Sequence, residues 1–275
     1  MGSGGGRIGL VAGNGRFPLL FAEAARKAGL EVVAAAHRGE ADPALEQAVH
    51  AFTWVQLGQV DRILSHFRRH GVERAVMAGG IGRVKAFTQV RPDLGALRII
   101  AGLRSFRDDA LLRAVASHFE RAGVAIVSPS EFVPELLAPE GHLAGPVLSE
   151  AQERDVKLGV EVATLLGQAD VGQAVVVKGG HVLALEAVEG TDEAIRRGGR
   201  YGGAGAVVVK LCKPGQDERF DLPAVGTRTL DTMQEVGATV LAVEAGRTLL
   251  LDPGSVLSEA SRRGLTVLGV APRAG

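Results

Sequence analysis

RIGLVAGNGRFP, residues 7–18, is the stretch that decides the fold of the first half of the chain. Its apolar run from Ile8 to Ala12 is typical of a buried strand, and Gly13-Asn14-Gly15 then turns the chain into a helix with Pro18 in its first turn. Further short apolar runs alternate with helical segments as far as Val127. This alternation predicts a parallel sheet with helices on both faces. Strands are expected at 30–36, 52–55, 75–78 and 124–127.

The second half of the chain has a different pattern. Residues 128–150 contain four prolines and are expected to link the halves. Within residues 151–275, Gly179-Gly180 is expected to turn a hairpin between 174–178 and 181–187, and a second hairpin is expected from 239–243 and 248–251. The sequence therefore predicts an α/β protein with a Rossmann-like parallel-sheet N-terminal domain, residues 7–127, and a mixed α/β C-terminal domain with hairpins.

Composition excludes several classes of function. The 275 residues include 31 basic and 31 acidic side chains, so the chain has no general attraction to nucleic acid, and aromatic residues are only 4%. The single cysteine, Cys212, cannot form an intrachain disulfide, which fits a reducing cytoplasm. The sequence has no HExxH or GxSxG motif, which disfavours a zinc or serine hydrolase.

Two glycine loops follow strands in the first half and are candidates for binding phosphate. Gly13-Asn14-Gly15 follows the first strand, and Gly79-Gly80-Ile81-Gly82-Arg83 follows the fourth. Ligands of doubly wound sheets bind beyond these strand ends, and Arg83 could hold two phosphate oxygens. Pro18 stands where a dinucleotide motif has its third glycine, so an NADP oxidoreductase, suggested by Arg38, is the weakest interpretation. Plain tight turns remain an alternative.

A second candidate site lies at residues 210–226, KLCKPGQDERFDLPAVG. Pro214-Gly215 and Pro223 restrict the backbone on both sides of Asp221, which suits a carboxylate that must keep one geometry as a general base or metal ligand. Lys210, Lys213 and Arg219 could neutralise a diphosphate. A solvated surface loop is the alternative, and this stretch leaves both open.

Glu189-Gly190-Thr191-Asp192 precedes a short helix, with Thr191 or Asp192 expected as the cap. Backbone donors, a hydroxyl and two acids at a helix start suit a phosphate bound to a metal. Asp192 or Glu189 could share metal binding or proton transfer with Asp221. The alternative is a simple capping motif, which would give Thr191 and Asp192 a role but would leave Glu189-Gly190 without one.

With these motifs the chain resembles the LpxI-type UDP-2,3-diacylglucosamine diphosphatases of lipid A biosynthesis. The resemblance covers nearly the whole chain and is most specific in EGTD at 189–192 and KPGQDERFDLPAVG at 213–226; GLVAGNGRFP at the start, DDALLR at 108–113 and EAGRTLLLD at 244–252 also fit. It implies hydrolysis at the α-phosphate to UMP and 2,3-diacylglucosamine 1-phosphate, with Mg²⁺ as the ion.

The resemblance also implies a set of site residues and a setting. Asp221 matches the catalytic aspartate of the family. The implied setting is a homodimer in the cytoplasm that touches the inner membrane transiently to reach its lipid-linked substrate. A UDP-sugar or nucleotide-binding module without chemistry is the alternative function. The expected catalytic residues are Asp221, Lys213 and Asp192; the expected substrate-binding residues are Gly13, Asn14, Gly79, Gly80, Arg83, Glu189, Gly190, Thr191, Lys210 and Arg219; and the expected metal ligands are Asp221 and Asp192.

Overall fold

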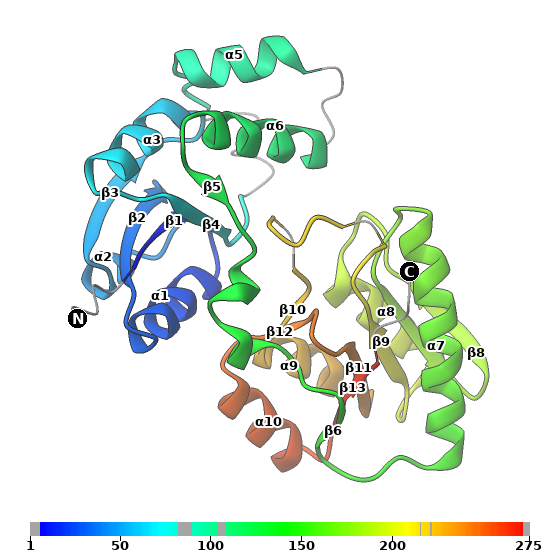
Figure 1. Ribbon diagram of the computed structural model, residues 1–275. Helices are drawn as coiled ribbons and strands as arrows, with labels where there is room; N and C mark the ends of the chain where they lie inside the picture. Colours follow the sequence, from blue (N-terminus) through cyan, green and yellow to red (C-terminus); the bar gives the residue numbers. More distant parts are fainter. Residues whose placement is uncertain (1–5, 82–89, 104–107, 215, 221, 272–275) are drawn as a thin grey trace. The chain divides into compact units, whose positions relative to one another are not determined.

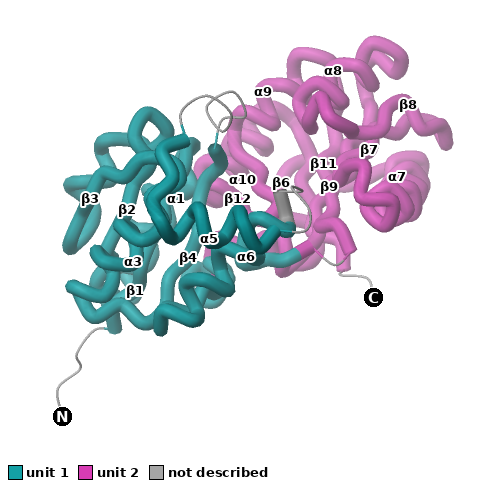
Figure 2. The backbone as a smooth tube through the Cα atoms, turned by 90° about the horizontal axis from the view of Figure 1, so that it is seen from above, with its two compact units in different colours: residues 1–133, 217–220 teal, residues 134–216, 221–275 magenta. Residues whose placement is uncertain are grey.

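The computed structural model describes residues 6–81, 90–103, 108–214, 216–220 and 222–271 (Figure 1). The chain divides into two compact units (Figure 2). The first unit holds Met1–Val133 together with Asp217–Phe220, and the second holds Pro134–Gln216 together with Asp221–Gly275. Residues 217–220 therefore belong to the first unit, although they lie in the second half of the sequence. Within the segment expected to be a linker, Gly141–Ala144 forms a strand of the second sheet.

The first unit is built on a five-stranded sheet with the order β3-β2-β1-β4-β5. Every pairing in this sheet is parallel. The predicted Rossmann-like α/β fold is confirmed. The strands are β1 (Arg7–Ala12), β2 (Glu31–His37), β3 (Ala51–Val55), β4 (Arg74–Ala78) and β5 (Ala125–Ile126).

Helices cover both faces of this sheet, as the continuous apolar strands require. Val11 and Val33 belong to a buried cluster with Phe67 of α3 and Phe119 of α6. Figure 1 shows α1, with its buried Phe21, on the opposite face. The helices are α1 (Phe17–Lys27), α2 (Leu45–Ala48), α3 (Val60–Arg69), α5 (Leu94–Gly102) and α6 (Asp108–Arg121), followed by the 3-10 turn η1 (Pro129–Glu131).

The second unit contains a six-stranded mixed sheet with the order β6-β13-β11-β9-β7-β8. Its three middle strands β13, β11 and β9 are parallel, whereas β6, β7 and β8 pair in antiparallel fashion. The strands are β6 (Gly141–Ala144), β7 (Ala174–Lys178), β8 (His181–Leu185), β9 (Val207–Lys210), β11 (Val240–Glu244) and β13 (Thr266–Val270).

Alternating side chains of this sheet face two helical layers. Val175 and Val209 pack in one cluster with Val156 of α7, whereas Val176 and Val208 pack with α8, α9 and α10. Gly159 of α7 is needed because a Cβ there would lie 2.4 Å from Val209. The helical elements are η2 (Pro134–Leu136), α7 (Glu150–Gln168), α8 (Thr191–Gly202), α9 (Thr227–Glu235) and α10 (Pro253–Arg262).

One of the two predicted hairpins is confirmed and the other is wrong. β7 and β8 form the antiparallel hairpin around Gly179-Gly180, both of which have positive φ. The expected hairpin of 239–243 with 248–251 does not form, because both edges of β11 already pair with β9 and β13. Instead β12 (Leu249–Leu250) pairs in parallel with β10 (Ala224–Val225) as a separate small sheet.

The Gly179-Gly180 turn is held by a buried carboxylate. Asp155 of α7 is 4% exposed and accepts the N–H groups of Gly179 and Gly180 at 2.8 and 2.7 Å. A hydrogen bond to a charged acceptor contributes roughly 1.5–3 kcal/mol. The Asp155 side chain thus fixes the hairpin against α7.

We expect Asp155→Ala to lower the free energy of unfolding by about 2–4 kcal/mol, because two N–H groups lose their acceptor. Urea unfolding followed by circular dichroism measures this. Glu153→Ala, which removes an exposed carboxylate from the same helix, is the control and should change stability by less than about 0.5 kcal/mol. Equal losses for both variants would show that the turn does not depend on Asp155.

Candidate functional site

The carboxyl edge of the first sheet holds both glycine loops. From β1 the chain winds outward to β2 and β3, and it then crosses back to β4 on the other side of β1. The order therefore reverses between β1 and β4, which is the position where doubly wound sheets bind ligands. Gly13 directly follows β1 and Gly79 directly follows β4, as the sequence predicts.

The two glycine loops are bonded to each other. Asn14 N–H donates to the Gly80 carbonyl at 2.7 Å, and Gly13 N–H donates to the Ala78 carbonyl at 2.8 Å. A Cβ at Gly13 would lie 2.2 Å from the Gly80 oxygen, and one at Gly79, where φ is 80°, would lie 2.2 Å from the Asn14 oxygen. Glycine at 13 and 79 is thus required by the contact between the loops. The N–H groups of Gly13 and Asn14 are therefore both engaged by backbone carbonyls.

Asn14 connects this loop pair to the end of β2. Its Nδ2 donates to Glu40 Oε2 at 2.8 Å, and its Oδ1 faces Gly80. His37, the last residue of β2, is buried, and burial lowers its pKa to about 4, with Glu40 acting in the opposite direction. The imidazole is therefore neutral at pH 7. The sequence did not single out Glu40, because a carboxylate three residues beyond a strand carries no signal of its own.

The Arg38 side chain makes a stacking contact within the first unit. Its guanidinium lies 5.7 Å from the centroid of the Trp54 ring at the end of β3. This contact occupies the side chain that suggested a 2′-phosphate. Arg83, the expected phosphate ligand of the second glycine loop, lies outside the described residues.

The EGTD motif lies at the start of α8, and the expected cap is wrong. Gly190, with φ of 85°, is the capping residue, because a left-handed backbone is needed there. Thr191 Oγ1 donates instead to Glu186 Oε1 at 3.0 Å. Asp192 Oδ2 lies 3.0 Å from Arg228 Nε, and Glu189 pairs with Arg197.

Residues 211–223 form a loop that we call the motif loop. Two buried charged residues hold its ends, and each is the last residue of an interior strand of the second sheet. Lys210, the last residue of β9, is 7% exposed and donates from Nζ to the Ala224 carbonyl at 3.0 Å. Glu244, the last residue of the neighbouring β11, is 5% exposed and accepts the Cys212 N–H at 2.8 Å. Arg247 lies 3.2 Å from the other Glu244 oxygen. Both ends of the loop are therefore bonded to adjacent strand ends.

The middle of the motif loop belongs to the first unit. Arg219 donates to both oxygens of Asp217, at 2.9 and 2.8 Å, and from Nη1 to Glu120 of α6 at 2.9 Å. The Arg219 guanidinium lowers the pKa of the Asp217 carboxyl. Ser128 Oγ donates to the Glu218 carbonyl at 3.2 Å, and Phe220 packs on the cluster around Phe67. The loop is thus anchored in both units.

The structure groups some of the predicted residues and separates others. It joins Gly13, Asn14, Gly79 and Gly80 in the first unit. In the second unit Lys213 Nζ pairs with Asp170 at 2.8 Å, and the EGTD acids have arginine partners of their own. Asp221, the expected base, lies outside the described residues. Sequence reasoning missed Glu244, although an acid that ends the buried run Val240–Val243 is a usable signal.

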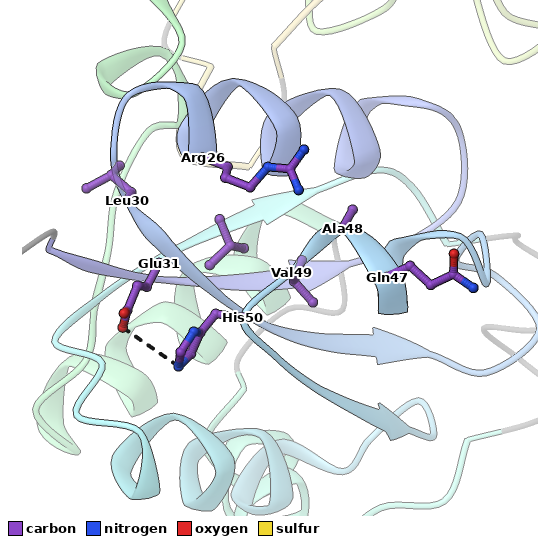
Figure 3. Close-up of a pocket in the computed structure, with 8 residues that line it drawn as sticks. Arg26, Leu30, Glu31, Gln47, Ala48, Val49 and His50 are labelled. Carbon is purple, nitrogen blue, oxygen red and sulfur yellow. Dashed lines mark ion pairs between the residues drawn. The ribbon is translucent and has the colours of Figure 1, made fainter.

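A small pocket lies at the opposite edge of the first sheet. It has a volume of about 220 Å³ between the end of α1 and the start of β2 (Figure 3). Glu31 lies 3.8 Å from His50 there. Because this edge faces away from the glycine loops, the pocket has no part in the predicted site. Its lining consists of Arg26, Leu30, Glu31, Val32, Gln47, Ala48, Val49 and His50.

The described residues show neither a preformed metal-binding cluster nor a membrane-spanning helix. Outside 1–5, 82–89, 104–107, 215, 221 and 272–275, no group of three or more His, Cys, Asp or Glu side chains is placed to hold a metal ion. Over the same residues, none of the helices has the length and apolar character needed to cross a bilayer.

The fold and its strand-end loops define a two-unit α/β protein whose first unit has the doubly wound topology of nucleotide-binding domains. Residues 7–136 match the LpxI N-terminal domain and residues 139–268 the LpxI C-terminal domain. The chain is 34% identical over 278 residues to the UDP-2,3-diacylglucosamine pyrophosphatase LpxI of Caulobacter vibrioides, covering 97% of this chain and 98% of the relative. The chain belongs to the LpxI family.

Two solved structures have a low similarity to this chain. Glycinamide-RNase-transformylase T from Mycobacterium tuberculosis aligns with 66% of this chain and 44% of its own, at 14% identity and a TM-score of 0.28. The gox2253 structure aligns with 96% of this chain and 89% of its own, at 11% identity and a TM-score of 0.30. The family assignment therefore depends on the sequence matches.

We expect the buried neutral His37 to make stability depend on pH. Because its pKa is about 4 in the folded chain and about 6.5 when unfolded, only the unfolded chain binds this proton between those values. Stability should fall by up to about 3 kcal/mol as pH drops from 6.5 to 4. Urea unfolding at pH 7 and 4.5 should show a smaller fall for His37→Gln than for the exposed control His181→Gln. The same fall in both variants would contradict the assignment.

We also expect Glu244→Ala to loosen the motif loop, since the buried Cys212 N–H loses its acceptor. Native-state hydrogen exchange should show faster exchange of the Cys212 amide, with a loss of about 1–3 kcal/mol in its opening free energy. The Leu241 amide within β11 is the internal reference. Glu235→Ala, which breaks an exposed ion pair with Arg196, should leave the Cys212 amide unchanged. Unchanged Cys212 exchange in Glu244→Ala would show that the bond does not hold the loop.

Proposed function

We propose that this chain hydrolyses UDP-2,3-diacylglucosamine at the α-phosphate, giving UMP and 2,3-diacylglucosamine 1-phosphate for lipid A biosynthesis. The observation that carries the proposal is the match to both LpxI domains, together with 34% identity over 97% of the chain to a relative named for this activity. The chain is accordingly a hydrolase that acts on a diphosphate. The doubly wound first unit suits the nucleotide part of such a substrate.

The chemistry requires positive charge and an oriented water. A diphosphate resists attack because its negative oxygens repel the nucleophile, so cations at the site lower the barrier. We assign this role to Lys210, Lys213, Arg83 and Arg219. Lys210 is the best placed for a fixed charge, because its ammonium is buried at a strand end and already bonded to Ala224. Lys213 is bonded to Asp170 and would have to exchange that partner for phosphate.

Asp221 is the residue proposed to accept the proton of the attacking water. It matches the family's catalytic aspartate and lies in the motif loop between Phe220 and Leu222. The bonds of Lys210 and Glu244 hold the ends of this loop, and the contacts of Arg219 hold its middle. A catalytic base must keep its direction, since small displacements of a catalytic group reduce the rate strongly, and we propose that these bonds of the described neighbours serve that need.

Mg²⁺ is proposed as the cofactor, with Asp221 and Asp192 as its protein ligands. The described residues do not form a site of three acids, and Asp192 is bonded to Arg228. Mg²⁺ is usually held by one or two carboxylates together with substrate phosphate oxygens, so a site completed by the diphosphate fits this donor set. When bound, the ion would neutralise charge on the phosphate oxygens. Asp192 would then release Arg228.

The nucleotide phosphates are proposed to meet the paired glycine loops of Gly13-Asn14 and Gly79-Gly80, with Glu189-Gly190-Thr191 as a further substrate contact. The bond between the loops fixes their positions before any ligand arrives. We also propose that the protein acts as a cytoplasmic homodimer and touches the inner membrane transiently, since its substrate carries two acyl chains.

We expect Asp221→Ala to retain the fold and substrate binding while its rate of UMP release falls by at least about 10³-fold, as for the loss of a general base. UMP release from UDP-2,3-diacylglucosamine with Mg²⁺ measures the rate, and calorimetry measures binding. Asp231→Ala, on the exposed face of α9, is the control and should keep the wild-type rate. Near-normal hydrolysis by Asp221→Ala would remove this residue from the mechanism. Failure of the wild-type chain to release UMP would instead favour the non-catalytic binding module.

A further inference from the structure

Helix α5 is apolar on its exposed face as well as on its buried face. Gly95, Ala96 and Ile99 are its buried residues. On the other side, Leu94 is 66% exposed and Leu97 50% exposed, and Ile100 is also exposed. At 100° per residue, these three side chains fall on one continuous arc of the helix surface. A surface helix normally presents polar residues there, so the exposed arc of α5 needs a partner.

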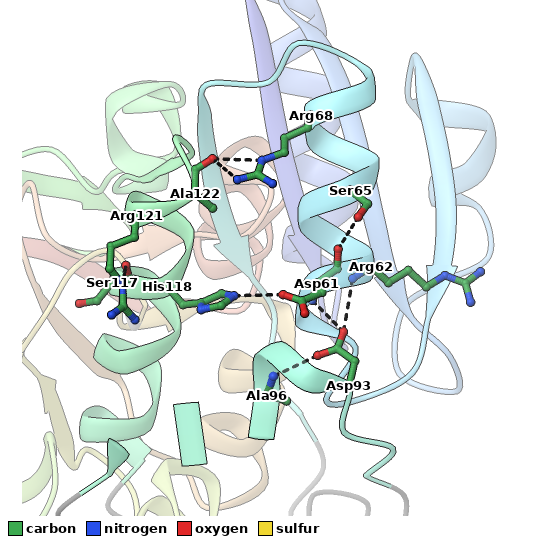
Figure 4. Close-up of polar contacts among 10 residues, drawn as sticks. All are labelled: Asp61, Arg62, Ser65, Arg68, Asp93, Ala96, Ser117, His118, Arg121 and Ala122. Carbon is green, nitrogen blue, oxygen red and sulfur yellow. Dashed lines mark hydrogen bonds and ion pairs between the residues drawn. The ribbon is translucent and has the colours of Figure 1, made fainter. Parts of the chain in front are cut away.

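The helix is firmly held in this orientation. Asp93 caps it by accepting the Ala96 N–H at 3.0 Å, and its other oxygen accepts the Asp61 N–H at 2.7 Å (Figure 4). Gly95 lies so close to α3 that a Cβ there would be 2.2 Å from Asp61 Oδ1. His118 of α6 also bonds to Asp61, at 3.1 Å. The exposed leucines are therefore fixed outward by a network of capping and packing contacts.

The start of α5 lies at the same edge of the first sheet as the glycine loops. Arg91 N–H donates to the Leu57 carbonyl, and Asp93 N–H donates to the Gly58 carbonyl. Residues 57 and 58 follow directly after β3, at the carboxyl ends of the parallel strands. The start of α5, next to Leu94, is thus at the edge of the unit where the nucleotide is proposed to bind.

Two arginines accompany this apolar face. Arg91 and Arg98 are both exposed, and Arg98 lies within the exposed arc of the helix. The carboxylate of Asp93 is engaged in the cap. An apolar helix face with a local excess of positive charge is complementary to an anionic lipid surface.

We propose that the exposed face of α5 is the surface by which the protein docks on an anionic lipid bilayer. A helix of nine residues is about 13 Å long, so it would lie in the plane of the headgroups and insert Leu94, Leu97 and Ile100 into the acyl boundary. The arginines would contact anionic headgroups. The inference rests on the proposed function in one respect, because it explains how a lipid-linked substrate reaches this chain.

The size of the face argues against a second copy of the chain as the occupant. A strip about 13 Å long and about 10 Å wide presents roughly 130 Å², whereas a stable interface buries about 800 Å² on each partner. Insertion of a few side chains into a bilayer has no comparable area requirement.

The test is binding of the full chain to vesicles. We expect the wild-type chain to co-sediment with phosphatidylglycerol vesicles and much less with phosphatidylcholine vesicles. Leu94→Ser/Leu97→Ser should weaken binding at least tenfold, and Arg98→Glu should weaken it most at low salt. Leu165→Ser, which changes a leucine 64% exposed on α7, is the matched control and should bind like wild type. Equal binding by the double variant and the control would overturn the proposal.

Further measurements test whether α5 inserts into the bilayer and whether another partner covers its exposed face instead. In a Trp54→Phe background, which removes the single native tryptophan, brominated lipids should quench the tryptophan fluorescence of the Leu97→Trp variant; no quenching would contradict insertion.

A fall in molecular mass for Leu94→Ser/Leu97→Ser in sedimentation without lipid would identify the face as a protein interface instead. UMP release from a water-soluble short-acyl substrate should be equal in the double variant and wild type, and its loss would place these leucines in the substrate site. A wild-type chain that binds vesicles but releases no UMP would refute the proposed function alone.

Discussion

The organisation of this protein depends on burial of both faces of its two sheets. Val175 and Val176 of one strand face different helical layers, so no side chain in the middle of the strand is free to carry chemistry. The Asp, Glu, Lys and Arg residues of the described strands all lie at strand ends, where the backbone leaves the ladder. Gly13, His37 and Gly79 occupy such positions in the first sheet, and Lys210 and Glu244 occupy them in the second. The candidate site is a consequence of this constraint.

The described residues of the motif loop are held by hydrogen bonds to charged side chains. Lys210 and Glu244 are buried charges on adjacent strands, and each uses its charge to hold one end of the loop through a backbone group. Hydrogen bonds to charged groups in a low-dielectric setting are stronger than those between neutral groups. The middle of the same loop is part of the first unit, where Arg219 bonds to Asp217 and Glu120. A hydrolase that must aim one water has reason to fix such a loop.

The proposed lipid surface and the proposed nucleotide loops share an edge of the first unit. This arrangement matches a substrate with a polar nucleotide and two acyl chains, because one edge could serve both parts. The anchoring of α5 by Asp93 and Gly95 indicates that its apolar face is a fixed property of the fold. The net charge of the chain gives no sign of this surface, since Arg91 and Arg98 are balanced by acidic residues elsewhere in the sequence.

The sequence by itself determined the doubly wound first half, the Gly179-Gly180 hairpin and the family, because apolar period, glycine turns and the two specific motifs are local signals. Tertiary structure decided the rest. It placed β12 beside β10, since both edges of β11 were already paired, and it made Gly190 the cap of α8. It also bonded the glycine loops to each other and put residues 217–220 in the first unit. These outcomes depend on contacts between residues far apart in the chain, which no local pattern encodes.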